Sequence, residues 1–395
     1  MKLFFITIQR ELRRVKRHPR YVILLTVGII FSYVFFITLT NEGQPEKLPI
    51  AVVDQDGSYL SRRLCHELNA TQGVKVVAVY GTHSEARRAM QRQEIYAFLE
   101  IPTGTYNRVL NFETPHIGIY TNNAFLLGGS LSYKTLATMG KLASGAVQRE
   151  ILRKKGIEEE KIMGLIQPVQ FDAHYIGNPM ASYQPYLMAT ILPGIIALIT
   201  LLLTIFQIAN EQKYGTAQEW IETAGGNIAC ALAGKLFPYT IWFTLIGIIG
   251  NIIFFGPLQF ALYGSFWMMV LDMVLLILAV QSMAIFLVAF IPDTHLAMCF
   301  GAIYGALSFT MAGFSFPVES MISPLQTLSY IFPLRQYYLI YSKYAIYGGN
   351  LNDCWLNVCG LLAFILLGAF SMLLFERQKN KEYHPAVVEE GEDDE

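Results

Sequence analysis

The chain has 395 residues, of which 53% are hydrophobic and only 15% are charged. Soluble domains carry about 25% charged residues, so this composition excludes an ordinary soluble protein and predicts an integral membrane protein. The net charge of −1 says little about partners, because the charges are segregated by segment and cancel only in the sum.

The first residues are basic and amphipathic. MKLFFITIQRELRRVKRHPR has seven Lys or Arg against a lone Glu11. Apolar residues recur on one face at helical spacing, namely Phe4, Ile8, Leu12 and Val15. This pattern predicts an interfacial amphipathic helix over 1–20, with its cations over anionic headgroups. The alternative is a basic flank that only sets topology.

Six apolar stretches are long enough to span a bilayer, which takes roughly 20 residues. They lie at 21–40, 186–209, 228–255, 263–291, 296–316 and 355–375. Because Lys and Arg near the spans mark the cytoplasmic side, the N-terminus is predicted to be cytoplasmic. Six crossings return the C-terminus to that side, where 377–395 forms an acidic tail. The expected fold is an α-helical integral membrane protein with six transmembrane helices, both termini cytoplasmic, and spans two to six within 184–376.

The long loop at 41–183 is predicted to be an inserted extracytoplasmic α/β domain. LPIAVVD, VKVVAVY, IYAFLEIP and HIGIYTNN have the character of strands, with helical spacing between them. Asp54 and Asp56 could be a catalytic pair, but beside Gly57 they favour a turn. His66 and Glu67 lack the second histidine of a zinc-protease helix. The cysteines form no metal motif and no nucleotide-binding G-x-x-x-x-G-K-[ST] loop occurs, so we expect no enzyme and no metal site.

The most polar segment of the second half, EQKYGTAQEWIETAGG at 211–226, lies between spans two and three and therefore faces the cytoplasm. Thr216 and Glu219 have capping-box spacing, and the two glycines at its end suit a helix C-terminus. One apolar face is predicted, made of Ala217, Trp220, Ile221 and Ala224. An exposed Trp and Ile among charges indicate a docking surface. The alternative is a capped loop against the headgroups.

Ionisable residues inside spans are functional candidates. Lys235 and Asp272 are interpreted first as a structural pair, with a proton or cation site as the alternative. Pro193 and Gly194 can bend the second span. The segment 317–345 is predicted to be a re-entrant outer hairpin, with an interfacial loop as the alternative. Its candidate gate residues are Phe316, Pro317, Pro333 and Arg335, the last anchored by headgroups or by Glu319.

Three stretches resemble the ABC-2 family of ABC transporter permeases. EQKYGTAQEWIET followed by AGKLFPY is similar to its E-x-x-x-G-T-x-E-x-x-x-x-T and G-K-x-x-P-Y patterns. MAGFSFPVESMISPLQTLSYIFPLRQYY resembles its segment after the fifth span, and GNPMASYQPYLMATILPGIIALI its second span. Trp220 and Ala224 stand where relatives usually carry Leu or extra Arg.

The resemblance implies a permease subunit in a bacterial cytoplasmic (inner) membrane. Its expected partners are two separate ABC ATPase subunits, a second permease protomer (itself or a paralogue), membrane lipids and, optionally, a periplasmic adaptor, with no nucleic acid. ATP and Mg would be bound by the ATPase, and this chain would carry no cofactor. The family's short helix after the second span couples ATP binding to the spans, which implies roles for Glu211, Gly215, Thr216, Glu219, Trp220 and Ile221.

The implied function is export of a hydrophobic or amphipathic small molecule, drug-like or lipid-like. The resemblance places five Met or aromatic residues along the central path, namely Tyr33, Phe36, Met188, Phe309 and Met311. Packing in the core or against lipid is the alternative for each. An ABC-2 permease for sodium or for a lipid-linked surface polymer is an alternative function. Other classes are a membrane-anchored receptor or assembly protein, and a secondary carrier, which would show inverted repeats.

Overall fold

The computed structural model describes residues 2–17, 19–111, 113–169, 171–172, 174, 176–291 and 293–378. The chain divides into two compact units. One is Met1–Asn41 together with Tyr175–Glu395, and the other is Glu42–His174. Most of the predicted acidic tail, residues 379–395, lies outside the described residues.

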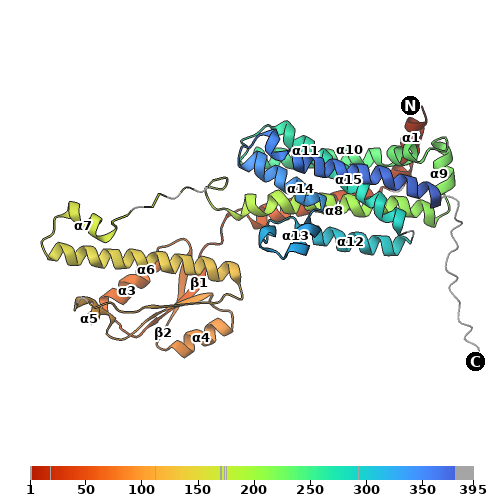
Figure 1. The fold of residues 1–395 in the computed structure, drawn as a ribbon. Coiled ribbons are helices and arrows are strands. Elements are labelled where there is room, and N and C mark those ends of the chain that lie inside the picture. The colour runs from red at the N-terminus through yellow and green to blue at the C-terminus, as the bar shows by residue number, and fades with distance from the viewer. Residues whose placement is uncertain are drawn as a thin grey trace, which may run out of the picture. The chain divides into compact units, whose positions relative to one another are not determined.

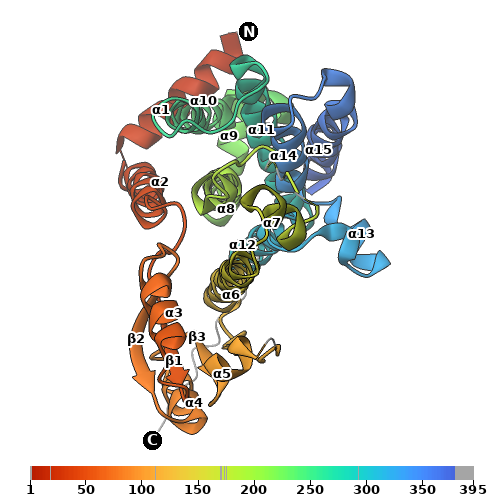
Figure 2. The same ribbon diagram turned by 90° about the vertical axis from the view of Figure 1, so that its left-hand side faces the viewer.

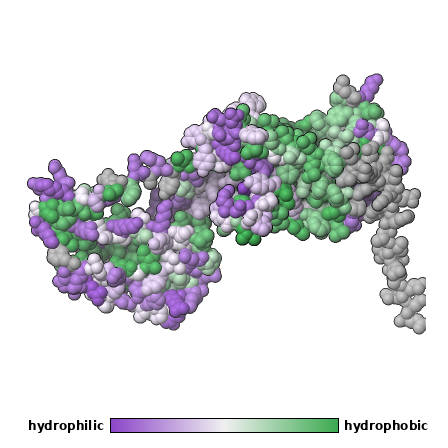
Figure 3. Space-filling model, viewed as in Figure 1, coloured by the Kyte–Doolittle hydropathy of each residue, from purple (hydrophilic) through white to green (hydrophobic). Residues whose placement is uncertain are grey.

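The first unit is a bundle of long apolar helices (Figure 1). Among the described residues, five helices are long and apolar enough to span a membrane: α8 (Tyr183–Lys213), α10 (Ile228–Phe255), α11 (Phe266–Phe290), α12 (Thr294–Met311) and α15 (Leu351–Gln378, apolar to Met372). A shorter apolar run, Leu25–Leu39, lies in α2 (Arg20–Leu39). Hydrophobic residues cover the middle of the bundle on the face drawn in Figure 3. These helices coincide with the predicted spans, while crossing by all six stays a prediction.

Local capping signals set where these helices begin. The side chains of Ser182, Asn227 and Asp293 accept hydrogen bonds from backbone N–H groups in the first turns of α8, α10 and α12. Pro193 lies inside α8, which continues through it. A Cβ at Gly194 would lie 2.4 Å from the Phe309 ring of α12 and 3.0 Å from a Leu334 methyl of α14. The glycine therefore allows three helices to pack closely.

The N-terminal helix α1 (Lys2–Arg17) packs along α10 and touches α9 (Ala217–Thr223), and Figure 2 shows it beside α10 at the edge of the bundle. The residues that the protein buries on α1 are polar, Thr7 and Glu11. Phe5 and Leu12 are exposed, as lipid-facing residues of an interfacial helix would be. Only Val15 of the expected apolar face packs against the main core of the bundle.

Between α12 and α15 the chain forms four short elements: the 3-10 turn η1 (Val318–Ser320), α13 (Ser323–Ser329), α14 (Pro333–Ile340) and the π-helical turn η2 (Tyr341–Ile346). Pro333 occupies the first turn of α14, where its missing N–H costs nothing. Packed against α8, α11, α12 and α15, α14 is largely buried. Its Arg335 is 7% exposed and lies 4.0 Å from Glu319. The predicted hairpin segment is thus helical and partly enclosed by the bundle.

The second unit is a three-layer α/β fold. Its sheet has the order β2-β1-β3-β4, formed by β1 (Leu48–Asp54), β2 (Val74–Tyr80), β3 (Ala97–Ile101) and β4 (Gly118–Thr121). β1 pairs in parallel with β2 and β3, whereas β4 is antiparallel to β3. The helices α3 (Tyr59–Asn69) and α6 (Leu126–Lys154) cover one face, and α4 (His83–Gln91) covers the other. Two further helices are α5 (Thr105–Leu110) and α7 (Glu159–Ile166).

The turn after β1 confirms the interpretation of Asp54. Its carboxylate accepts hydrogen bonds from the backbone N–H of Asp56 at 3.1 Å and of Gly57 at 2.9 Å, and from the Ser61 hydroxyl at 2.8 Å. A carboxylate occupied by its own turn is a structural group, as expected for Asp at a strand end. The carboxylate of Asp56 in turn accepts from the backbone N–H of Tyr106.

Candidate functional site

The polar segment between α8 and α10 folds as a compact turn, helix and turn at one end of the bundle. Gly215, with φ of +68°, lets the chain leave α8, and α9 follows at Ala217–Thr223. Gly225 and Gly226 then adopt φ of +71° and +81°. These left-handed conformations end α9, as the sequence predicts, because glycine adopts them without strain.

The short helix α9 is anchored by the side chains that were expected to be exposed. Trp220 is 0% exposed, and Ile221 and Ala224 are also buried. The Trp220 indole N–H donates to the carbonyl oxygen of Ala231 in α10 at 3.2 Å. The prediction of an exposed Trp and Ile as docking surface is therefore wrong: the apolar face of α9 packs onto this chain. What α9 presents to solvent is polar, namely Gln218, Glu219 and Glu222.

The predicted capping box is also wrong. Thr216 precedes α9, but its side chain makes no capping hydrogen bond to that helix. Its hydroxyl donates instead to the Glu211 carboxylate at the end of α8. The backbone carbonyl oxygen of Glu219 accepts a hydrogen bond from the hydroxyl of Thr223, which lies one turn later in α9. Spacing alone cannot reveal this arrangement, because it depends on the turn at Gly215, which brings the Glu211 carboxylate next to the Thr216 hydroxyl.

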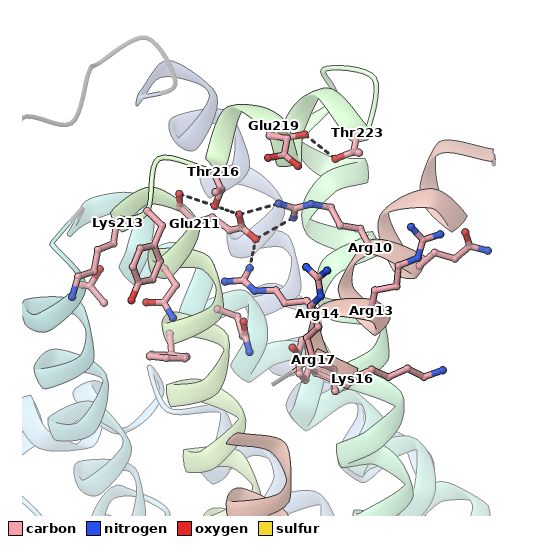
Figure 4. Close-up of a pocket in the computed structure, with 18 of the residues that line it drawn as sticks. Arg10, Arg13, Arg14, Lys16, Arg17, Glu211, Lys213, Thr216, Glu219 and Thr223 are labelled. Atoms are coloured by element: carbon pink, nitrogen blue, oxygen red, sulfur yellow. Dashed lines mark hydrogen bonds and ion pairs between the residues drawn. The ribbon is translucent and has the colours of Figure 1, made fainter. Parts of the chain in front are cut away.

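Glu211 is the centre of an ionic cluster (Figure 4). Its buried carboxylate accepts from Lys235 Nζ at 2.7 Å and from the guanidinium of Arg10 at 3.1 and 3.3 Å. Arg14 pairs with the same carboxylate, and Thr216 completes the set. Charge-assisted hydrogen bonds of this kind compensate the loss of water around a buried charge. One carboxylate thus ties α1, α8, α10 and the turn before α9 together.

A second carboxylate extends the cluster. Glu11 of α1 is buried, and it pairs with Lys235 Nζ at 3.1 Å and accepts the Tyr239 hydroxyl at 2.7 Å. Lys235 is 0% exposed and also lies over the Trp220 ring, with Nζ 5.2 Å from the ring centroid. The cluster therefore joins the N-terminal helix to the anchor of α9. Sequence reasoning missed Glu11, although a single acidic residue in a segment of seven cations was the available signal.

The expected pair of Lys235 and Asp272 is not formed. Lys235 lies seven residues from the start of α10, and Asp272 lies six residues from the start of α11, which runs back in the opposite direction. At 1.5 Å per residue the two side chains are separated by roughly 20 Å along the bundle. Both are buried, but Lys235 is neutralised by two glutamates, while neither carboxylate oxygen of Asp272 has a hydrogen-bond partner among the described residues.

A large cationic cavity of about 1390 Å³ lies beside the ionic cluster. Six lysines and arginines line it, namely Arg10, Arg13, Arg14, Lys16, Arg17 and Lys213. Only two acidic residues do so, Glu211 and Glu219. Figure 4 shows Arg10 and Arg14 reaching from α1 toward Glu211 at the end of α8. The exposed side of the site is therefore positively charged, which favours contact with an acidic surface.

The five residues predicted to border the central path are distributed over α2, α8 and α12. Tyr33, Met188 and Met311 are buried, while Phe36 and Phe309 pack partly buried against the main core. Tyr33 stacks on Phe254 of α10, with ring centroids 6.0 Å apart. None of the five lines the cationic cavity. In this conformation they are packing residues, and their role along a path stays a prediction.

Comparison with known proteins identifies the family. The family model for the ABC-2 family transporter protein matches residues 20–374. The chain is 21% identical over 383 residues to the probable multidrug ABC transporter permease YbhR of Escherichia coli K12, a match that covers 94% of this chain and 97% of the relative. The protein of the same name from Escherichia coli O157:H7 matches equally. These matches span both the bundle and the inserted unit.

Proposed function

Since this chain belongs to the ABC-2 family of transporters, we propose that it exports a hydrophobic or amphipathic small molecule by using ATP hydrolysed on a separate subunit. The chain is a permease subunit of an ABC transporter, a multi-pass protein of the inner membrane. Its sequence has no phosphate-binding G-x-x-x-x-G-K-[ST] loop, so ATP and Mg belong to the partner ATPase. The proposal adds two ATPase copies and a second permease protomer, which is most simply another copy of this chain.

The observation that carries the proposal is the way α9 is attached. Its exposed side is polar, while its buried Trp220 is fixed to α10 by a hydrogen bond. The ionic cluster at Glu211 and Lys235 then joins α10 to α1 and to the end of α8. A displacement of α9 by an ATPase would therefore move α8, α10 and α1 together, because buried ion pairs resist separation. This is the mechanical link that an ATP-driven permease needs between its partner and its spans.

The charge at the site suits the proposed partner. The cavity beside α9 presents six cations against two glutamates. An ATPase surface with acidic residues would be attracted to this rim and oriented on it. Glu219 lines the same cavity and lies on the exposed side of α9, so it would bind a basic residue of the partner.

The substrate class rests on the relative and on the bundle. YbhR is described as a probable multidrug permease. Aromatic and methionine side chains of α2, α8 and α12 pack between the helices in this chain, and such side chains adapt to apolar ligands of varied shape. Movement of these helices would open an apolar path, with α13 and α14 at its outer end.

Charge reversal on α9 tests the coupling role. We expect Glu219→Lys in the full-length permease, reconstituted with its ATPase in nanodiscs, to abolish transport-coupled ATP hydrolysis while leaving dimer assembly intact. The matched control is Glu160→Lys, which makes the same change at an exposed side chain of α7 in the inserted unit. Unchanged coupling in Glu219→Lys would refute the role of α9, and equal loss in both variants would indicate a general defect.

A further inference from the structure

Asp272 is a carboxyl group that the ionic cluster does not use. It lies in α11, six residues from the start of that helix, and is 0% exposed. Neither of its carboxylate oxygens has a hydrogen-bond partner among the described residues. The side-chain amide of Asn251 in α10 donates to a backbone group instead. Its acceptor is the carbonyl oxygen of Met269, one turn before Asp272 in α11, at 3.3 Å. The aspartate is therefore enclosed by protein, and no group in the described part of the chain pairs with its carboxylate.

None of the buried cations of the bundle pairs with Asp272 among the described residues. Lys235 is held by two glutamates near the opposite end of α10. Lys343 donates to the Asp353 carbonyl oxygen at 3.1 Å and to the Asn357 amide oxygen at 3.0 Å. Arg335 lies over the Tyr330 ring, with 5.6 Å to its centroid. An unpaired carboxylate is strongly unfavourable in such a place, so the group must either lose its charge or bind a cation.

The described residues include no group of three or more acidic, His or Cys side chains that would gather around a metal ion at Asp272. The titratable groups that interact with Asp272 are Tyr337 of α14 and Cys354 of α15, and both are ordinarily neutral near pH 7. Tyr33 and Tyr341, which interact with Tyr337, are also phenols. A proton needs only the one carboxylate, so it is the ligand that this arrangement favours.

A line of polar side chains leads toward this region. Lys343 of η2 donates to the Asn357 side-chain oxygen of α15 at 3.0 Å, and the Asn357 amide donates to the Gln336 side-chain oxygen of α14 at 2.8 Å. Asn357 and Gln336 are buried between α14 and α15. Cys354, which interacts with Asp272, lies one turn before Asn357 on α15. Buried amides and hydroxyls of this kind can relay hydrogen bonds through an otherwise apolar interior.

We propose that Asp272 is a proton-binding site inside the helical bundle. In this conformation the side chain is a neutral carboxylic acid. Its proton exchanges with water from the end of the bundle where α15 begins, past the polar side chains of α14 and α15. Movement of α14 away from α11 would admit water, stabilise the carboxylate and release the proton. This role goes beyond ATP-driven export, because it adds a proton that the membrane domain binds and releases.

Infrared difference spectroscopy tests the proposal directly, without transport or ATPase. The full-length protein in nanodiscs should show a carboxylic acid C=O stretch that shifts in D2O. This band should be lost in Asp272→Asn and kept in Asp353→Asn, an exposed aspartate at the start of α15. Asp272→Glu should move the band rather than remove it, which covers the case in which the asparagine variant misfolds.

A second experiment tests the path by which the proton of Asp272 exchanges with water. Asn357→Leu should leave the band in place but slow its shift after transfer to D2O several-fold. An ionised-carboxylate signal assigned to Asp272 at neutral pH would overturn the proposal, because it would show a bound cation or a cationic partner. An exchange rate unchanged by Asn357→Leu would overturn the route past α14 and α15. Because neither readout depends on export, failure here is distinguishable from failure of the proposed function.

Discussion

Removing the Lys235 ammonium should destabilise the permease more than any other single change at the ionic cluster. Lys235→Met keeps the length and apolar stem of the side chain but deletes its charge. Glu211 would keep Arg10, Arg14 and Thr216 as donors. Of its partners among the described residues, Glu11 would keep the Tyr239 hydroxyl and lose its cation. The cost therefore arises at Glu11, which would become a buried carboxylate without a cation.

The magnitude follows from the burial of both partners. Breaking a fully buried ion pair by removing one partner costs about 3–5 kcal/mol, because the other charge is left uncompensated. Lys235 and Glu11 have side chains 0% and 1% exposed, so solvent screens neither of them. Replacing Glu11 as well, by glutamine, removes the orphaned charge. The double variant Glu11→Gln/Lys235→Met should therefore be more stable than the sum of the single losses by about 1–3 kcal/mol.

The assay is a double-mutant cycle on the full-length protein in mixed micelles, with unfolding by SDS followed by circular dichroism. Arg17→Met is the matched control, because this cation on α1, the helix that carries Glu11, is exposed and should change the free energy of unfolding by less than about 0.5 kcal/mol. A loss below about 1 kcal/mol in Lys235→Met would refute the reasoning. So would strictly additive losses in the double variant, since they would mean that the two charges do not stabilise each other.

Three further predictions concern packing and reactivity. Trp220→Ala should cost about 3–5 kcal/mol in the same unfolding assay, because it empties a fully buried indole site, whereas exposed Gln218→Ala should be nearly neutral. Gly194→Ala should cost about 1–3 kcal/mol by overpacking, while Gly28→Ala, with nothing within 4 Å of the new Cβ, should be neutral or stabilising. Burial and the nearby Asp54 charge raise the pKa of the Cys65 thiol, so its reaction with a membrane-impermeant maleimide should be slow at neutral pH and accelerate as pH rises and thiolate forms. A Cys65 labelling rate that does not change with pH would contradict this environment.

Features that depend on residues close together in the sequence could be predicted from the sequence. The apolar runs determine where α8, α10, α11, α12 and α15 form, since hydrocarbon requires about 20 apolar residues in a helix that satisfies its own backbone. The strands of the inserted unit follow from short β-branched runs bounded by turn residues. The end of α9 at Gly225 and Gly226 follows from glycine's freedom to adopt positive φ. The resemblance to ABC-2 permeases rests on motifs of this contiguous kind, and the family match bears it out.

The partners of buried charges were decided only by the tertiary structure. Lys235 pairs with Glu11, 224 residues away, because α1 packs back along α10, and no local pattern encodes that contact. Trp220 among charged residues resembles an exposed docking residue until α10 is placed beneath it. Asp272 and Lys235 are both intramembrane charges in the sequence, yet antiparallel helices place them toward opposite ends of the bundle. Hydrophobicity along the chain determines that a segment is buried, whereas the path of the backbone in space determines which charge meets which, because electrostatic pairing acts over a few ångströms and is indifferent to sequence separation.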